Sequence, residues 1–173
     1  PGLSLAVTDR ERYLGGVVDG FAGLEARDPV RAHHRFQIGS ISKGFTALAV
    51  LQEVEAGRIE LDAPVTRYLP WFEVRTSFSP IRIHHLLSHT AGLIVGVDFT
   101  GDAASEVWSL RETETGFAPG ERFLYSNVGY KTLGLVLEAA GTVLVIDFEA
   151  GTGSGVLFRV DRLSGQRGMV SDF

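Results

Sequence analysis

The feature that most constrains the fold is an apolar helical pattern that runs from Ser40 to about Ala56. Its early part, FTALAVL, leaves almost no polar face, which is typical of a buried helix. A strand-like run ends just before it at Gly39, and Gly57 follows as a candidate C-terminal cap. The sequence therefore predicts a central, rigid helix with Ser40 at its N-terminus.

Ser40 and Lys43 lie three residues apart, so at the start of a helix they share one face. A serine at this position is ordinarily an N-cap, but a capping box would have Glu or Gln where Lys43 stands. A lysine in the first turn meets the positive end of the helix dipole, which costs about 0.3–1 kcal/mol and favours the neutral amine. A neutral amine beside a hydroxyl is a base beside a nucleophile. This S-x-x-K pair therefore indicates nucleophilic catalysis, with N-capping as the alternative.

The overall composition excludes several other classes of function. The chain has 173 residues and a formal net charge of −5, and its acidic and basic residues are interspersed, so no patch suggests nucleic-acid binding. It has no cysteine, which excludes disulfides and thiolate metal sites. No apolar run reaches the roughly 18 residues of a membrane span. Lys43 and Lys131 are the only lysines, so the S-x-x-K pair does not come from a lysine-rich background.

A second candidate pair, Tyr125 and Asn127, stands just before a helical pattern over Val128–Ala140. That helix carries one apolar stripe, which includes Leu133 and Leu137. Taken alone, the pair has an ordinary structural explanation: Asn127 would be the N-cap of the helix and Tyr125 a partly buried aromatic residue. Its occurrence together with the S-x-x-K pair favours a catalytic role.

The combined motifs resemble the serine hydrolases of the class C β-lactamase and penicillin-binding-protein family, which includes related esterases and D-amino-acid peptidases. The resemblance covers FQIGSISKGFTALAVLQEVEAGRIELDAPVTRYLP at 36–70, IHHLLSHTAGL at 83–93 and FLYSNVGYKTLGLVLEAAG at 123–141. Residues 1–20 are similar to the opening strand pair of the family. The match therefore extends over residues 1–141, in order and with consistent spacing.

The resemblance implies a role for each motif residue. Ser40 would be the acylated nucleophile, Lys43 would help to take its proton, and Tyr125 would move protons between Ser40, Lys43 and the leaving group. Asn127 would bind the acyl-side amide or carbonyl of the substrate, and the Ser40 backbone N–H would supply one oxyanion donor. The substrate would be a β-lactam, a D-amino-acid peptide or a small ester. The reaction would be acyl transfer to serine followed by hydrolysis, with no cofactor and no metal.

The patterns and the resemblance together predict an α+β (αβ multi-layer) fold of the β-lactamase/transpeptidase type. Residues 3–7 and 13–18 should form an antiparallel hairpin, and Arg35–Ile38 a short third strand. A mostly antiparallel sheet from both ends of the chain would pack on the nucleophile helix, beside a small helical region. Residues 1–141 would be the front part of the hydrolase domain. Residues 142–173 are interpreted as a C-terminal β-meander, the remnant of an accessory β domain.

The family's third motif, Lys- or His-x-Gly on a strand beside the serine, has no counterpart in this chain. No lysine follows Lys131, no histidine follows His89, and Gly151–Gly153 lacks the cation. We therefore expect an internal truncation after Gly141. The apolar surface and strand edges left open would favour homo-oligomers or swapped assemblies. The alternative function is a catalytically impaired remnant retained for assembly or ligand binding.

The histidines offer a third, minor alternative. His85 and His89 are four residues apart, a spacing that can bind zinc on a helix and support a metal-dependent hydrolase. No nearby carboxylate completes a ligand set, and the resemblance assigns this segment to structural support. Family members often work outside the cytoplasm, which implies a periplasmic or secreted location. The sequence shows no targeting segment.

Overall fold

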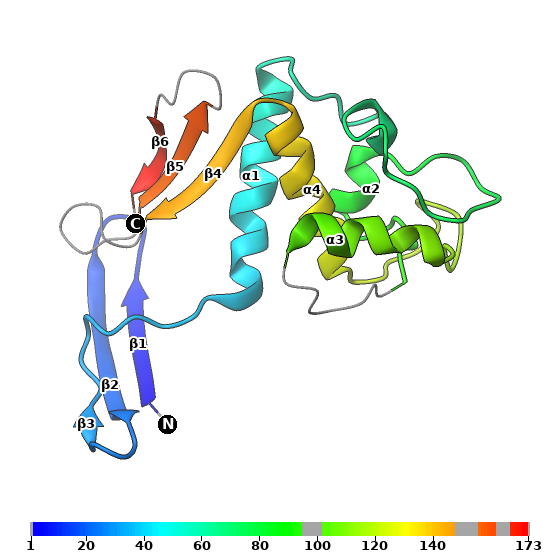
Figure 1. Cartoon of the computed structure of the whole chain (residues 1–173). Helices are drawn as coiled ribbons and strands as arrows, with labels where there is room; N and C mark the ends of the chain where they lie inside the picture. The colour runs from blue at the N-terminus through cyan, green and yellow to red at the C-terminus, as the bar shows by residue number, and fades with distance from the viewer. Residues whose placement is uncertain (1, 95–101, 148–155, 162–166, 173) are drawn as a thin grey trace. The chain divides into compact units, whose positions relative to one another are not determined.

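The computed structural model describes residues 2–94, 102–147, 156–161 and 167–172. The chain divides into two compact units, Pro1–Gly39 and Ser40–Phe173, and each is described by itself. Figure 1 shows the elements in chain order, with the strands of the first unit in blue and the helices from cyan to gold.

The first unit is a three-stranded antiparallel sheet in the order β1-β2-β3. Strand β1 (Gly2–Thr8) pairs with β2 (Tyr13–Gly23), so the predicted N-terminal hairpin is confirmed. The carboxylate of Asp9 closes the turn between them, because its Oδ1 accepts the N–H groups of the next two non-adjacent residues, Glu11 and Arg12, each at 2.8 Å.

The third strand of this sheet differs from the prediction. It is β3 (Asp28–Pro29), whereas Arg35–Ile38 have no regular structure. The reason lies in the next residue: Val30 is buried, and its N–H donates to the carbonyl of Gly20 at 3.0 Å. This contact holds the chain against β2 at residues 28–30, earlier than the sequence pattern indicated.

The second unit begins with a group of helices. They are the short 3-10 helix η1 (Gly39–Ile41), α1 (Ser42–Glu55), η2 (Val65–Arg67), α2 (Ile83–Leu87), α3 (Ala103–Trp108), η3 (Ser109–Glu112) and α4 (Asn127–Ala139). Helix α4 contacts α1, α2 and α3 (Figure 1). It is therefore the helix around which the others of this unit gather.

One cluster of buried apolar side chains forms the core of the helical region. Its members come from all four α-helices and the segments between them, and include Val50, Ile59, Val65, Ile83, Leu86, Leu93, Val107, Leu110, Leu133, Val136 and Leu137. The predicted stripe of α4 is confirmed, because its leucines at 133 and 137 are almost fully buried in this cluster. The core thus fixes α4 against α1, α2 and α3.

The expectation that the first long helix is buried on nearly all sides is wrong. Among the side chains of α1 only Ala49, Val50 and Glu53 are buried, whereas Leu48 and Leu51 are 43% and 47% exposed. The three buried positions share one face of the helix. Ala49 and Val50 join the core cluster that also holds the stripe of α4, so burial follows the face that packs against the other helices.

Both long helices end as the sequence predicts. Gly57 follows α1 with φ +72°, and its N–H donates to the carbonyl of Val54 at 2.9 Å. Gly141 follows α4 with φ +87°, and its N–H donates to Glu138 at 3.0 Å. Both glycines occupy the left-handed region, which satisfies helix carbonyls that would otherwise be unpaired.

The C-terminal strands form a second antiparallel sheet. Strands β4 (Thr142–Asp147), β5 (Val156–Asp161) and β6 (Arg167–Asp172) pair in the order β4-β5-β6, as a meander requires. The single sheet expected from both ends of the chain would join strands of the two units, and it stays a prediction. The packing of a sheet on the nucleophile helix and the domain boundary after Gly141 stay predictions.

A glycine in the loop after α2 gives a stability prediction. Gly92 has φ +70°, and a Cβ added there would lie 2.6 Å from the carbonyl oxygen of Phe117. Gly57 has a similar φ of +72°, but nothing lies within 4 Å of its added Cβ.

We expect Gly92→Ala to lower the free energy of unfolding by about 2–4 kcal/mol, because the alanine would be strained at this φ and would overlap the Phe117 carbonyl. The matched control Gly57→Ala should cost only about 1–2 kcal/mol. Urea denaturation followed by circular dichroism measures both, and equal losses would contradict the overlap argument.

Candidate active site

Ser40 lies on η1, the turn that leads into α1. The helix itself starts at Ser42, and the residue at its N-cap position is Ile41, with no side-chain capping bond. The alternative that Ser40 is only an N-cap is therefore wrong. Its side chain is exposed, and its hydroxyl is contacted by two other polar side chains of the predicted site.

These two contacts bring the predicted catalytic residues together. Lys43 Nζ donates a hydrogen bond to Ser40 Oγ at 3.2 Å, as the three-residue spacing led us to expect. The Tyr125 hydroxyl donates to the same oxygen at 2.7 Å, although Tyr125 is 85 positions further along the chain. Ser40 Oγ thus accepts a hydrogen bond from the Lys43 side chain and another from the Tyr125 phenol.

The environment of Tyr125 favours its ionised form. The hydrogen bond from Lys43, followed by the one with Ser40, holds the pKa of the phenol below its ordinary value of 10.0. The side chain is 44% exposed, so solvent moderates this effect. A phenolate with one proton donor on each side is a suitable acceptor for the Ser40 proton.

Lys43 also faces two aromatic rings. Its Nζ lies 5.0 Å from the ring centroid of Tyr125 and 5.9 Å from that of Tyr130. The face of an aromatic ring attracts a cation at these distances. These rings supply an attraction for a cation that the sequence argument did not include.

The link between Lys43 and Tyr125 gives a prediction on pH dependence. Lys43→Met keeps most of the side-chain volume and removes the group that lowers the pKa of Tyr125 most. The pKa of Tyr125 should therefore rise toward its ordinary value, and its ionisation should move to higher pH. A ¹³Cζ-tyrosine NMR titration of both proteins measures the shift. An unchanged Tyr125 titration would show that Lys43 does not act on this phenol.

Asn127 is the first residue of α4, and the N-cap is its neighbour Ser126. Ser126 Oγ accepts the N–H of Gly129 at 3.1 Å, so the alternative that Asn127 caps the helix is wrong. The exposed Asn127 instead lines a cavity of about 370 Å³. The other lining residues are Ser42, Lys43, Thr46, Glu106, Tyr130 and Lys131. Asn127 and Lys43 therefore share one cavity, and Lys43 also contacts the Ser40 hydroxyl.

The wall of this cavity contains an ion pair that the sequence did not suggest. Lys131 on α4 donates to Glu106 on α3, whose side chain is only 7% exposed. The sequence signal for it is slight: Lys131 is the only lysine besides Lys43. A buried carboxylate needs such a partner, because an isolated charge in the interior is costly.

The two histidines of the zinc alternative each use a ring nitrogen on the backbone. His85 Nδ1 accepts the N–H of Arg82 at 3.0 Å, and His89 Nδ1 accepts the N–H of Ser126 at 3.1 Å. In the part of the chain that the structure describes, no three His, Asp, Glu or Cys side chains gather as a metal site would require. Within the same part, no helix is long and apolar enough to cross a bilayer.

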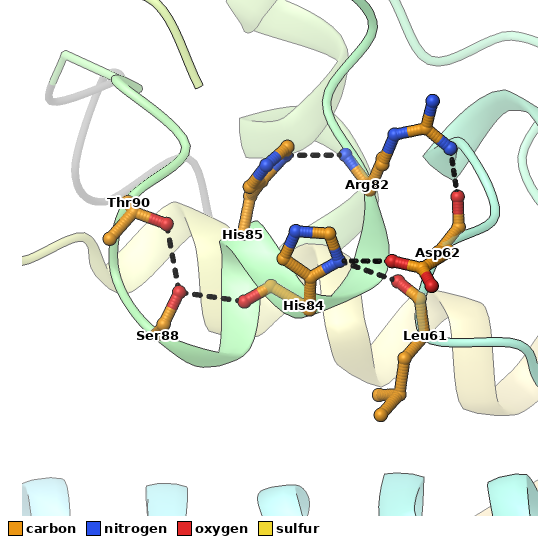
Figure 2. A network of polar contacts seen from close by, with 7 residues as sticks. All are labelled: Leu61, Asp62, Arg82, His84, His85, Ser88 and Thr90. Carbon is orange, nitrogen blue, oxygen red and sulfur yellow. Dashed lines mark hydrogen bonds and ion pairs between the residues drawn. The ribbon is translucent and has the colours of Figure 1, made fainter. Parts of the chain in front are cut away.

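A polar network anchors α2, the helix before His89 (Figure 2). His84 Nδ1 lies 3.1 Å from both the carbonyl of Leu61 and the carboxylate of Asp62. At the C-terminal end of the helix, Ser88 Oγ donates to the carbonyl of His84 at 2.7 Å and lies 2.8 Å from the hydroxyl of Thr90. The network fixes both ends of this short helix, and with them the turn that carries His89.

Comparison with known proteins agrees with these observations. The family model described as Beta-lactamase matches residues 1–145. Esterase EstB of Burkholderia gladioli is 34% identical in an alignment 192 residues long, gaps included, that covers 91% of this chain and 46% of the relative. Penicillin-binding protein 4* of Bacillus subtilis (strain 168) is 31% identical over 140 residues, which cover 75% of this chain and 30% of the relative.

A solved structure adds support for the fold. EstCE1, described as a hydrolase with promiscuous acyltransferase activity, matches 80% of this chain and 42% of its own length, with a TM-score of 0.71 and 28% identity. The helices with antiparallel strands therefore form an α+β fold of the β-lactamase/transpeptidase type, as predicted. The chain belongs to the Beta-lactamase family. It spans less than half the length of each of these three relatives.

Proposed function

We propose that this chain is a serine hydrolase that cleaves amide or ester bonds through an acyl-serine intermediate on Ser40. The observation that carries the proposal is the double contact at Ser40 Oγ, with Lys43 Nζ at 3.2 Å and the Tyr125 hydroxyl at 2.7 Å. A serine hydroxyl is a weak nucleophile until a neighbouring base takes its proton. The lowered pKa of Tyr125 supports its phenolate as that base, and Lys43 would supply the positive charge that stabilises it.

The proposed reaction has two steps. Ser40 Oγ attacks the carbonyl carbon of the substrate while its proton passes to the Tyr125 oxygen. The bond to the leaving group then breaks, and Tyr125 gives this proton to the departing oxygen or nitrogen. In the second step Tyr125 takes a proton from water, the resulting hydroxide attacks the acyl carbon, and the proton returns to Ser40 as it leaves.

Two further groups would bind the substrate in this proposal. The Ser40 backbone N–H, on η1 just before α1, would donate to the oxygen that becomes negative in the tetrahedral intermediate, a kind of contact worth about 10²–10³-fold in rate. Asn127 would hydrogen-bond the acyl-side amide or carbonyl. Its place in the wall of the same cavity as Lys43 supports this assignment.

The substrate class follows from the family and stays broad. The two curated relatives are an esterase and a penicillin-binding protein, and the solved structure is a hydrolase. We therefore propose a β-lactam, a D-amino-acid peptide or a small ester as substrate. Each contains a carbonyl carbon that a serine hydroxyl can attack to form an acyl-serine, so all three fit one mechanism.

The test is a labelling experiment on the intact chain. The protein is incubated separately with a fluorophosphonate and with a penicillin, and its mass is measured before and after. A single adduct that peptide mapping places on Ser40 is the expected result, because both reagents report an activated serine. A folded chain that remains unlabelled by both reagents would overturn the proposal.

A second candidate is the catalytically impaired remnant, retained for assembly or ligand binding. Within these 173 residues no lysine follows Lys131 and no histidine follows His89, so the family's third motif has no cation. Steady turnover of a chromogenic ester or cephalosporin that Lys43→Ala abolishes would exclude this candidate.

The exposed apolar side chains of α1 also support the proposal that the chain forms homo-oligomers. Leu48 and Leu51 on this helix are both more than 40% exposed. A second copy that covers them would remove apolar surface from water, which is favourable. We further propose that residues 1–141 are the front of the hydrolase domain and residues 142–173 an accessory β segment.

A further inference from the structure

We propose that His89 is a positioning residue, whose neutral imidazole holds the Tyr125 ring against Lys43 and Ser40. This inference rests on the proposed function, because it concerns the orientation of the proposed base. The first observation is a ring contact: the centroids of His89 and Tyr125 are 4.5 Å apart, with 30° between the ring planes. Tyr125 is partly exposed, and this ring contact restrains its direction together with its contacts to Ser40 and Lys43.

The second observation is that His89 binds the backbone on both sides of Tyr125. The N–H of Leu124 donates to the carbonyl of His89 at 2.8 Å, and the N–H of Ser126 donates to His89 Nδ1 at 3.1 Å. The residues immediately before and after Tyr125 are thus fixed by one residue. Two hydrogen bonds and a ring contact together set the position and the direction of the phenol.

The backbone of His89 is itself held in an unusual conformation. Its φ is +56°, in the left-handed region, which few residues other than glycine adopt without support. The N–H of Thr90 donates to the carbonyl of His85 at 2.8 Å, and the N–H of His89 donates to Leu86 at 3.3 Å. The network of Figure 2 holds α2. The turn that follows α2 places the His89 imidazole against the Tyr125 ring.

The role requires the imidazole to be neutral. Nδ1 can accept the Ser126 N–H only when it carries no proton, so the ring proton belongs on Nε2. Burial, followed by the charge of Lys43, lowers the pKa of His89 below its ordinary value of 6.5. The other titratable groups that face the ring are the phenols of Tyr125 and Tyr130. Protonation at lower pH would place one N–H against another and release the Ser126 contact.

Two variants separate the parts of this role. His89→Asn keeps an acceptor, Oδ1, at the place of Nδ1, tolerates a positive φ, and cannot be protonated in this pH range. His89→Phe keeps a ring of similar size and loses the acceptor, which leaves the buried Ser126 N–H unpaired. Loss of position should act on kcat more than on KM. We expect His89→Phe to lower kcat by about 10²-fold and His89→Asn by less than about tenfold.

A readout that needs no turnover distinguishes this inference from the proposed function. In a ¹³Cζ-tyrosine NMR titration, His89→Phe should move the pKa of Tyr125 up toward its ordinary value of 10.0, because the phenol leaves Lys43, while His89→Asn should keep it lowered. As the pH falls through the lowered pKa of His89, the parent should show a change in the Tyr125 signal that His89→Asn lacks.

The outcomes are decisive for each idea separately. If Ser40 takes no label but the Tyr125 titration responds to His89 as expected, the proposed function fails and the positioning role stands. If Ser40 is labelled, and Tyr125 titrates identically in the parent and in a folded His89→Phe, the positioning role is overturned. Equal losses of kcat in His89→Phe and His89→Asn would also overturn it, since the acceptor at Nδ1 would then have no effect.

Discussion

Replacing Ser40 with alanine is expected to abolish the fluorophosphonate adduct and to reduce ester hydrolysis to the uncatalysed background. The substitution removes the oxygen that both Lys43 and Tyr125 contact, while these two side chains remain in place. Loss of a catalytic serine removes most of the acceleration in serine hydrolases, so we expect a decrease of about 10³-fold or more in kcat. Intact-mass spectrometry and a chromogenic ester assay measure the two effects.

The control for this prediction is Ser77→Ala, which removes an exposed hydroxyl from a loop outside the site. It should leave labelling and hydrolysis as they are in the parent. Ser40 is also exposed, so neither substitution should change the free energy of unfolding by more than about 0.5 kcal/mol. Labelling of Ser40→Ala at the parental rate would mean that another residue is the nucleophile.

Local spacing predicted one half of the site. Ser40 and Lys43 are separated by less than one helical turn, so the backbone alone brings them to a contact of 3.2 Å. The same holds for Gly57, whose positive φ follows from its place just after a helix. Such features depend on neighbouring residues in the chain and can therefore be inferred from the sequence.

The other half depends on contacts between distant segments. Nothing in the spacing places Tyr125 beside Ser40, and only the family resemblance suggested it. Both Ser126 and Asn127 suit an N-cap, and tertiary contacts choose between them: the Ser126 N–H is held by His89, and α4 starts one residue later. His89 itself was assigned to structural support, without the contacts that connect it to Tyr125.

The exposure of α1 shows a related limit. The periodicity of a helix shows where its apolar side chains lie, but not which element covers them. The face that includes Val50 meets the core cluster, and the same pattern puts Leu48 and Leu51 on exposed faces. An apolar pattern on all sides therefore predicts that partners are needed, and leaves open which segments or chains supply them.

Tyr125→Phe is expected to give the second large loss. The substitution removes only the hydroxyl that donates to Ser40 at 2.7 Å and keeps the ring that packs against His89. Loss of a positioned proton acceptor lowers rates by about 10²–10⁴-fold, so kcat/KM should fall within that range while the fold is retained. Steady-state hydrolysis of a chromogenic ester, together with circular dichroism, measures both.

The pH dependence provides a sharper form of this prediction. The pKa of Tyr125 lies below its ordinary value of 10.0, because of Lys43 first and Ser40 second. In the parent, kcat/KM should rise with pH through that lowered value as the phenol becomes the phenolate base, and fall when the pH drops below it. In Tyr125→Phe this rise should disappear, since the titrating group is gone.

The matched control is Tyr13→Phe, which removes an exposed phenol hydroxyl from strand β2. It should retain both the rate and the pH profile of the parent.

A Tyr125→Phe protein with the parental rate and the same rise with pH would show that Tyr125 is not the base. In that case Lys43, the other group in contact with Ser40 Oγ, would have to take the proton as the neutral amine. Lys43→Met should then abolish acylation while Tyr125→Phe leaves it unchanged, and this contrast assigns the base to one of the two residues.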